Sequence, residues 1–301
     1  MSKENIIIGI IGLGYVGLPL AKSYLQSDIT VLGFDVDIAK VENLNQGKSA
    51  LEIFPNSFLK ESLKNKKFQA HHSFSAIKKC DAVIICVPTP LDKFHQPDLS
   101  YVISSIKSVV KFLKKGALVS LESTTYPGTS FEIIKPLLES HGFVVGKDIH
   151  LCYSPEREDP GNHEYTLKNT PKVISGFSQK CLSKAKEIYS LVCDTLVPVS
   201  SLEAAELCKL IENIQRSVNI GLMNELRLFA EKTDINLFEV IDAAATKPFG
   251  FTPYYPGPGV GGHCIPIDPF YLTFKAREFG VHTRFIELAG EVNESMPSYI
   301  I

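Results

Sequence analysis

Four residues in the second half of the chain have the types and spacing needed for nucleophilic chemistry. Lys209 and Asn213 lie four positions apart in ELCKLIEN, so on a helix they would share one face. Cys264 lies in GVGGHCIPID, where glycines leave a thiol accessible, and Asp268 follows four residues later. A nearby ammonium group would lower the pKa of the thiol and increase the nucleophilic thiolate fraction. Spacing alone also permits a solvated lysine and a packed cysteine.

A second group of residues, near the N-terminus, has the pattern of a dinucleotide site. Residues 12–17 read GLGYVG and lie between an expected strand and an expected helix. Gly12 would permit a tight turn, Gly14 would let a pyrophosphate approach the backbone, and Gly17 would let the helix pack closely on the strand. Asp35 ends the next expected strand, where its carboxylate would bind the ribose hydroxyls and repel a 2′-phosphate. The pattern therefore predicts NAD as cofactor, with a glycine turn beside a surface aspartate as the alternative.

Three neighbours complete the predicted cofactor site. Tyr15 and Val16 fill the turn between the glycines, and Lys40 is expected near the adenosine end. A solvated lysine on a helix is an equally good interpretation of Lys40.

Bulk composition excludes several classes of protein. The chain has 301 residues and a formal net charge of −2, which gives no reason to expect nucleic acid or an anionic membrane as a partner. No apolar run approaches the roughly 18 residues needed to span a bilayer, and the apolar N-terminal segment is expected to be a first strand, not a signal peptide. The seven cysteines show neither CxxC nor zinc-ligand spacing, which predicts no metal site and favours a reducing, cytoplasmic location. Most of these cysteines are expected to be buried.

The elements that must position these residues follow an alternating pattern. Apolar residues recur at helical spacing over residues 18–25 and 100–113. Alternating strands and helices with short connections predict an α/β fold, with a Rossmann-type parallel sheet covered by helices. The expected strands are residues 6–11, 30–34, 82–87, 118–122, 151–153, 172–175 and 195–199.

The pattern changes near Ser200, where a long helix is expected to run to about Lys232. Ser200 and Glu203 have the spacing of a capping box at its start. We therefore expect an NAD-binding domain over residues 1–199 and a helical middle domain over residues 200–301. An apolar stripe is expected to hold Lys209 and Asn213 in the interior or at a cleft edge, and it comprises Ala204, Leu207, Ile211, Ile214, Val218 and Leu222. The Gly- and Pro-rich residues 253–269 should form a loop, and residues 284–301 begin as a helix.

Taken together, these motifs resemble the UDP-glucose/GDP-mannose dehydrogenase family over essentially the whole chain. The matching stretches are GIIGLGYVGLPLA, CVPTPLD, ESTTYPGT, YSPEREDPG, AELCKLIENIQRSVNIGLMNEL and PGPGVGGHCIPIDPFYL. The SPER and GGHCIPID segments are most similar to the branch that oxidises N-acetylhexosamine nucleotides. The resemblance ranks UDP-N-acetylglucosamine first as substrate, UDP-N-acetylmannosamine second and UDP-glucose third.

The resemblance also implies a mechanism and residue roles. A sugar CH2OH would be oxidised to a carboxylate with reduction of two NAD, through an aldehyde and a thioester on Cys264. Lys209 and Asn213 would stabilise the oxyanion and contact substrate, Gly261 would lie along the sugar, and Asp268 would lie near the thiol. Glu156, also near the substrate, and Thr124 would handle water and proton transfer, while Val87, Thr89 and Thr124 would lie near the nicotinamide. Some relatives carry a second glutamate where this chain has Pro160, which leaves the hydrolytic base open between Glu156, Asp268 and a bound water.

Length and assembly give further expectations. The family normally continues into a second Rossmann-like domain that binds the substrate's nucleotide, so we expect this chain to bind NAD but to turn over poorly by itself. The resemblance implies a homodimer through the long helix. Two alternatives remain: a two-electron dehydrogenase of the β-hydroxyacid or 6-phosphogluconate type, against which GGHCIPID argues, and an NAD-binding remnant without activity.

Overall fold

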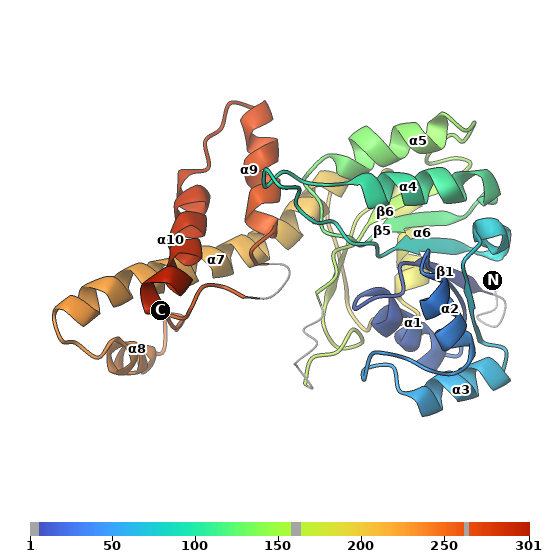
Figure 1. Ribbon diagram of the computed structural model, residues 1–301. Coiled ribbons are helices and arrows are strands. Elements are labelled where there is room, and N and C mark those ends of the chain that lie inside the picture. The colour runs from blue at the N-terminus through green and yellow to red at the C-terminus, as the bar shows by residue number, and fades with distance from the viewer. Residues whose placement is uncertain (1–5, 158–163, 262–264) are drawn as a thin grey trace. The chain divides into compact units, whose positions relative to one another are not determined.

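The computed structural model describes residues 6–157, 164–261 and 265–301 (Figure 1). The chain divides into two compact units. The first, which we call the sheet unit, comprises residues 1–89 and 98–209. The second, the helical unit, comprises residues 90–97 and 210–301.

The sheet unit is built on a six-stranded parallel sheet in the order β3-β2-β1-β4-β5-β6. The register places Ile10 of the central strand opposite Gly33 on one side and Ile84 on the other. Almost every residue of the central strands is buried, as expected for a parallel sheet covered on both faces. This arrangement confirms the predicted Rossmann-type fold. The strands are β1 (Ile7–Ile11), β2 (Thr30–Phe34), β3 (Phe68–His71), β4 (Ala82–Ile85), β5 (Leu118–Leu121) and β6 (His150–Tyr153).

Helices connect these strands and cover the sheet. The Tyr24 hydroxyl of α1 donates to the Ile188 carbonyl of α6 at 3.5 Å, which joins the two helices within one apolar core. On the chain between β4 and β6, α4 packs against α5. A separate two-stranded parallel sheet is formed by β7 (Lys172–Ile174) and β8 (Leu196–Pro198). The helices are α1 (Gly17–Gln26), α2 (Ile38–Asn45), α3 (Asn56–Lys64), η2 (Phe74–Lys79), α4 (Ser100–Val109), η3 (Val110–Phe112), η4 (Ser130–Ile134), α5 (Lys135–Glu139) and α6 (Gln179–Tyr189).

The long helix α7 (Leu202–Lys232) belongs to the sheet unit up to Lys209 and to the helical unit from Leu210. Within the helical unit, α9 packs against α10. The remaining elements of this unit are α8 (Leu237–Ala245), α9 (Asp268–Glu278) and α10 (Arg284–Ile300).

The start of α7 corrects one prediction. The Ser201 hydroxyl, not that of Ser200, accepts a hydrogen bond from the Ala204 N–H at 3.1 Å. The helix begins at Leu202, so Ser201 occupies the capping position and the predicted Ser200–Glu203 capping box is wrong by one residue.

The burial of α7 corrects a second prediction. Ile211 and Leu222 of the expected apolar stripe are 54% and 49% exposed. The interior side of the helix carries other apolar residues, such as Leu210 and Met223, together with a polar stripe. The members of this polar stripe recur at spacings of three, four and seven residues. They are Glu206, Lys209, Asn213, Ser217 and Asn224.

Five cysteines are buried as predicted, namely Cys80, Cys86, Cys152, Cys181 and Cys193, while Cys208 is half-buried. Among the helices that the structure describes, none combines the length and apolar character that a membrane crossing would need.

Candidate active site

The predicted cofactor residues lie at the carboxyl ends of the parallel strands. The GLGYVG turn follows β1, and Asp35 follows β2 directly. Val87 and Thr89 follow β4, Thr124 follows β5, and Glu156 follows β6. Because strands in a parallel sheet end at one edge, the fold gathers residues from five separate segments there.

The three glycines of the turn differ in what a side chain would meet. Gly12 has φ +90°, and a Cβ there would lie 2.7 Å from the Cys86 carbonyl oxygen. At Gly17 a Cβ would lie 1.9 Å from the Gly12 carbonyl oxygen, so only glycine lets α1 pack this close to the turn. A Cβ at Gly14 would meet no atom within 4 Å, which leaves open space beside the backbone.

The surroundings of this turn fit a pyrophosphate. The first turn of α1 carries no acidic residue, so its partial positive charge is not offset. Tyr15 is exposed and Val16 half-buried at the same turn. The residues present therefore fit the phosphates of a dinucleotide.

Asp35 is a buried carboxylate with several hydrogen-bond donors around it. Its oxygens accept from the Leu13 N–H at 2.9 Å, the Asp37 N–H at 3.0 Å and the Lys40 ammonium at 2.9 Å. Burial opposes ionisation, but the hydrogen bonds from Lys40 and the two N–H groups outweigh it and hold the pKa of Asp35 below its usual value. Lys40 is thus an ion-pair partner of the predicted ribose-binding acid rather than a solvated lysine.

The loops after β4 and β5 are joined at the site edge. The Ser123 hydroxyl donates to the Val87 carbonyl at 2.7 Å, which fixes the segment of Thr124 beside that of Val87 and Thr89. Thr124 and Thr89 are both half-buried. The two loops that were predicted to flank the nicotinamide therefore lie against each other.

Glu156 and Lys209 also come together. The Lys209 ammonium donates to the Glu156 carbonyl oxygen at 2.7 Å and lies 3.7 Å from its carboxylate. Lys209 is only 7% exposed, and Glu156 is half-buried. The sheet unit thus pairs a buried cation with the carboxylate predicted to move protons.

In the helical unit, Asn213 and Asp268 form a buried pair. The Asn213 amide donates to the Asp268 carboxylate at 2.5 Å, and the two residues are 8% and 1% exposed. This contact joins α7 to the start of α9, four residues after Cys264. Cys264 and Pro160 lie outside the described residues.

The glycine-rich segment that precedes Cys264 is anchored to helices of the same unit. The Gly257 N–H donates to the Asn224 side-chain oxygen at 2.9 Å, and the Tyr254 hydroxyl donates to the Gln215 side-chain oxygen at 2.9 Å. Residues 251–261 contain no helix or strand, and Gly261 is exposed with φ +57°. The backbone near Gly261 is therefore open to a ligand.

Sequence reasoning missed several buried polar residues beside these positions. Glu206 accepts from the Gly128 and Ser130 N–H groups at 2.6 and 2.8 Å, and burial raises its pKa to about 7. Its position three residues before Lys209 places both on one helical face, a signal that was available in the sequence. Lys172 and Glu122 carry no comparable local signal, since they are 50 positions apart and pair only in the fold.

Metal ligation has no support within the part of the chain that the structure describes, where His, Cys, Asp and Glu side chains do not gather in groups of three or more.

The comparison with protein families matches both units. Residues 6–193 match the NAD binding domain, and residues 203–295 the central domain, of the UDP-glucose/GDP-mannose dehydrogenase family. With the Rossmann-type sheet and the dinucleotide turn, this defines an NAD-dependent oxidoreductase. The chain belongs to the UDP-glucose/GDP-mannose dehydrogenase family, and it is a nucleotide-sugar dehydrogenase.

Individual relatives agree with this assignment. The chain is 40% identical over 298 residues to protein CapL of Staphylococcus aureus, covering 98% of this chain and 69% of CapL. It is 38% identical to UDP-N-acetyl-D-glucosamine 6-dehydrogenase of Pseudomonas aeruginosa, covering 99% of this chain and 70% of that enzyme. A solved structure of the UDP-D-ManNAc dehydrogenase of Pyrococcus horikoshii superimposes with a TM-score of 0.91 at 34% identity, covering 98% of this chain and 69% of that chain.

Proposed function

We propose that the protein oxidises the C6 hydroxymethyl group of a UDP-N-acetylhexosamine to a carboxylate, with UDP-N-acetylglucosamine as the favoured substrate. The observation that carries the proposal is the buried contact between Asn213 and Asp268, which joins the helix of Lys209 to the segment that follows Cys264. Relatives named as UDP-N-acetylhexosamine dehydrogenases support the substrate class.

The proposed chemistry uses a nucleophile, an oxyanion site and a base. The Cys264 thiolate adds to the C6 aldehyde, and a thioester forms when the adduct is oxidised. Lys209 and Asn213 donate hydrogen bonds to the oxygen that becomes negatively charged. Glu156 accepts a proton from the water that attacks the thioester, and the C–S bond breaks to return the thiolate. NAD, when bound, accepts a hydride in each of the two oxidations.

The balance of the reaction gives a stoichiometric test. One CH2OH group, two NAD and one water yield one carboxylate, two NADH and three protons. The purified protein should therefore form two NADH for each UDP-N-acetylglucosamine consumed. One NADH per sugar would favour a two-electron dehydrogenase, and NAD binding without any NADH would favour a protein that binds the cofactor without this activity.

Cys264 gives the sharpest test of the thioester. We expect Cys264→Ala to stop carboxylate formation, because an aldehyde without an added nucleophile does not reach the state that gives up a second hydride. NAD affinity should stay unchanged, since the dinucleotide turn belongs to the other unit. Product analysis by mass spectrometry and cofactor titration measure the two quantities. Carboxylate formed at the wild-type rate by Cys264→Ala would rule out this mechanism.

UDP-N-acetylmannosamine is the second candidate substrate. It is favoured by the 36% identity to the UDP-N-acetyl-D-mannosamine dehydrogenase of Pyrococcus horikoshii. Comparison of kcat/KM for the two epimers and for UDP-glucose decides among them. A higher kcat/KM for the mannose epimer would overturn the proposed preference.

A further inference from the structure

A buried ion pair contacts residues 154–157, an irregular segment that carries Glu156 and that we call the Glu156 turn. The Lys172 ammonium contacts the Glu122 carboxylate at 3.0 Å and donates to the Pro155 carbonyl oxygen at 3.2 Å. The Lys172 and Glu122 side chains are only 2% and 1% exposed. Burial alone would lower the pKa of Lys172, but the negative charge of Glu122 outweighs this effect and raises the pKa above its usual value. The ammonium therefore stays charged and remains a hydrogen-bond donor.

Glu122 is held in turn by a buried hydroxyl pair. The Tyr189 hydroxyl donates to the other Glu122 oxygen at 2.6 Å and lies 2.8 Å from the Ser120 hydroxyl. Tyr189 and Ser120 are fully buried. The Glu122 carboxylate, which Tyr189 holds in place, therefore fixes the position of the Lys172 ammonium.

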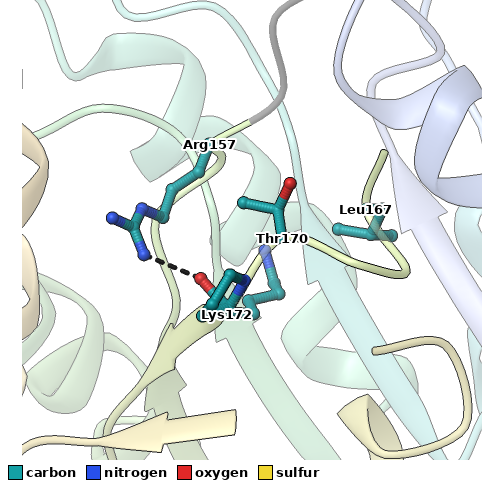
Figure 2. A pocket seen from close by; sticks show the side chains of 5 residues that line it. Arg157, Leu167, Thr170 and Lys172 are labelled. Atoms are coloured by element: carbon teal, nitrogen blue, oxygen red, sulfur yellow. Dashed lines mark hydrogen bonds between the residues drawn. The ribbon is translucent and has the colours of Figure 1, made fainter. Parts of the chain in front are cut away.

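A second hydrogen bond runs in the opposite direction between the same two segments. The Arg157 guanidinium donates to the Pro171 carbonyl oxygen at 2.7 Å, as Figure 2 shows in the small pocket between these residues. Lys172 thus binds the carbonyl of Pro155, the residue before Glu156. Arg157, the residue after Glu156, binds the carbonyl of Pro171, the residue before Lys172. Glu156 lies between two reciprocal anchors.

The energetics of a buried ion pair suggest that its role is to position neighbouring groups rather than to stabilise the fold. A buried ion pair gains little over well-packed apolar residues of similar size, because both charges lose their hydration. Pro155 has no N–H to donate, so this turn has fewer backbone hydrogen bonds available to fix it. The Lys172 ammonium supplies a hydrogen bond to the carbonyl of this residue, which cannot donate one of its own.

We propose that Lys172, held by Glu122 and complemented by Arg157, is a positioning residue that fixes the Glu156 turn and so places the Glu156 carboxylate for thioester hydrolysis. The inference rests on the proposed function for its catalytic consequence. Its structural consequence, an ordered turn, stands by itself. Lys172 acts through Glu156 and does not touch the reacting atoms.

The test uses two variants, because Lys172→Met alone would leave the Glu122 charge buried without its partner. The first is the double variant Lys172→Met with Glu122→Gln, which removes both charges and keeps an acceptor for Tyr189. The second is Arg157→Gln, at a half-buried position. The matched control is the double variant Lys114→Met with Asp81→Asn, which removes a 2.8 Å ion pair between the residue before β4 and the segment before β5.

Two measurements separate positioning from general stability. Hydrogen exchange at the Glu156 and Arg157 amides should accelerate about tenfold in both test variants and remain unchanged in the control. In rapid-quench kinetics with UDP-N-acetylglucosamine, hydrolysis of the thioester should slow on the order of tenfold to a hundredfold, while the first hydride transfer changes little. The protein-bound acyl group would then accumulate and be detected by intact mass.

Each outcome decides the inference. Faster exchange at the turn together with selectively slow hydrolysis supports it. Unchanged exchange at Glu156 overturns it, and so does an equal slowing of hydride transfer and hydrolysis, which would indicate a merely structural pair. If the wild-type protein forms no NADH, the proposed function fails, and the exchange comparison alone still decides whether Lys172 fixes the turn.

Discussion

Asp35 is a single carboxylate with two tasks at the dinucleotide turn. It accepts the Leu13 N–H and so ties the turn after β1 to the end of β2, and it forms an ion pair with Lys40. Its pKa lies below the usual value, so at neutral pH it presents a full negative charge. In the predicted role of Asp35, that charge would accept hydrogen bonds from the ribose hydroxyls and repel a 2′-phosphate.

We therefore expect Asp35→Ser to weaken NAD binding by about tenfold or more, because charge-assisted hydrogen bonds are lost. The preference for NAD over NADP should shrink at the same time, since Lys40 would no longer face a carboxylate. Calorimetric titration with both cofactors measures the two effects. Asp37→Ser is the control, because Asp37 caps α2 through the Lys40 N–H and serine caps a helix equally well. An unchanged cofactor preference in Asp35→Ser would contradict the role of Asp35.

The ionisation of Glu206 should make the free energy of unfolding depend on pH. Burial raises its pKa from 4.5 to about 7, although two backbone N–H groups donate to it. The folded protein holds the proton more tightly than the unfolded chain, so protonation favours folding. This contribution is complete below pH 4.5 and is lost as the pH rises through about 7.

Glu206→Gln should remove this pH dependence. Relative to the variant, the wild-type protein should lose up to about 3 kcal/mol of unfolding free energy as the pH rises through this range. Urea denaturation at a series of pH values gives the difference. Glu225→Gln, at an exposed position of the same helix, should leave the pH profile unaltered. Parallel profiles for wild-type protein and Glu206→Gln would show that Glu206 does not titrate in this range.

At the scale of the element, α7 carries two stripes of different character. One is a buried polar stripe, and within the helical unit each of its polar groups meets a partner: Asn213 meets Asp268, and the Asn224 amide donates to the Asn293 side-chain oxygen at 2.9 Å. The Asn293 amide donates in turn to the Ser217 carbonyl at 3.0 Å. This network holds α10 to α7 through Asn293, and it holds the glycine-rich segment to α7 through Gly257.

Removal of the amide at Asn293 should therefore loosen the segment that leads to Cys264. We expect Asn293→Ala to cost about 2 kcal/mol of unfolding free energy, because buried donors and acceptors lose their partners, and to accelerate hydrogen exchange at Gly257. Denaturant titration and exchange mass spectrometry measure these changes. The matched control is Asn219→Ala, which removes a hydrogen bond to the Gln215 carbonyl on the same helix. Equal losses in the two variants would argue against the network.

At the scale of the whole molecule, the second stripe of α7 bears on assembly. Ile211, Leu222 and Phe229 are 54%, 49% and 63% exposed, and their spacing of eleven and seven residues places them on one face of the helix. Exposed apolar stripes of this kind are typical of interaction surfaces. We propose that α7 pairs with α7 of a second copy to form a homodimer, as the family resemblance implies.

If the protein forms this dimer, its sedimentation coefficient should depend on protein concentration, and one substitution in the interface should shift the monomer–dimer equilibrium. Phe229→Glu places a charge in the apolar stripe and should shift the equilibrium toward monomer by at least tenfold, since an unpaired charge is poorly tolerated in an interface. Phe285→Glu, at an exposed aromatic of α10, should leave the equilibrium unchanged. A wild-type protein that is monomeric at all concentrations would contradict this assembly.

Local pattern was sufficient for the parts of the protein whose chemistry is local. The GLGYVG turn, Asp35 and every strand of the six-stranded sheet except β3 were predictable, because glycine conformation, strand hydrophobicity and short connections act over a few residues. β3 (Phe68–His71) was not among the expected strands. The capping residue was missed by one position, since Ser200 and Ser201 are chemically equivalent until backbone geometry separates them.

Tertiary structure alone decided which face of α7 is buried. Periodicity shows that two stripes differ, but the polar stripe enters the interior only because Asp268, Asn293 and the N–H groups near Gly128 supply its hydrogen bonds. It likewise decided the pairing of Lys172 with Glu122, because residues 50 positions apart meet only after the strands have assembled. A buried charge is tolerated only beside its partner, and no short stretch of sequence contains both.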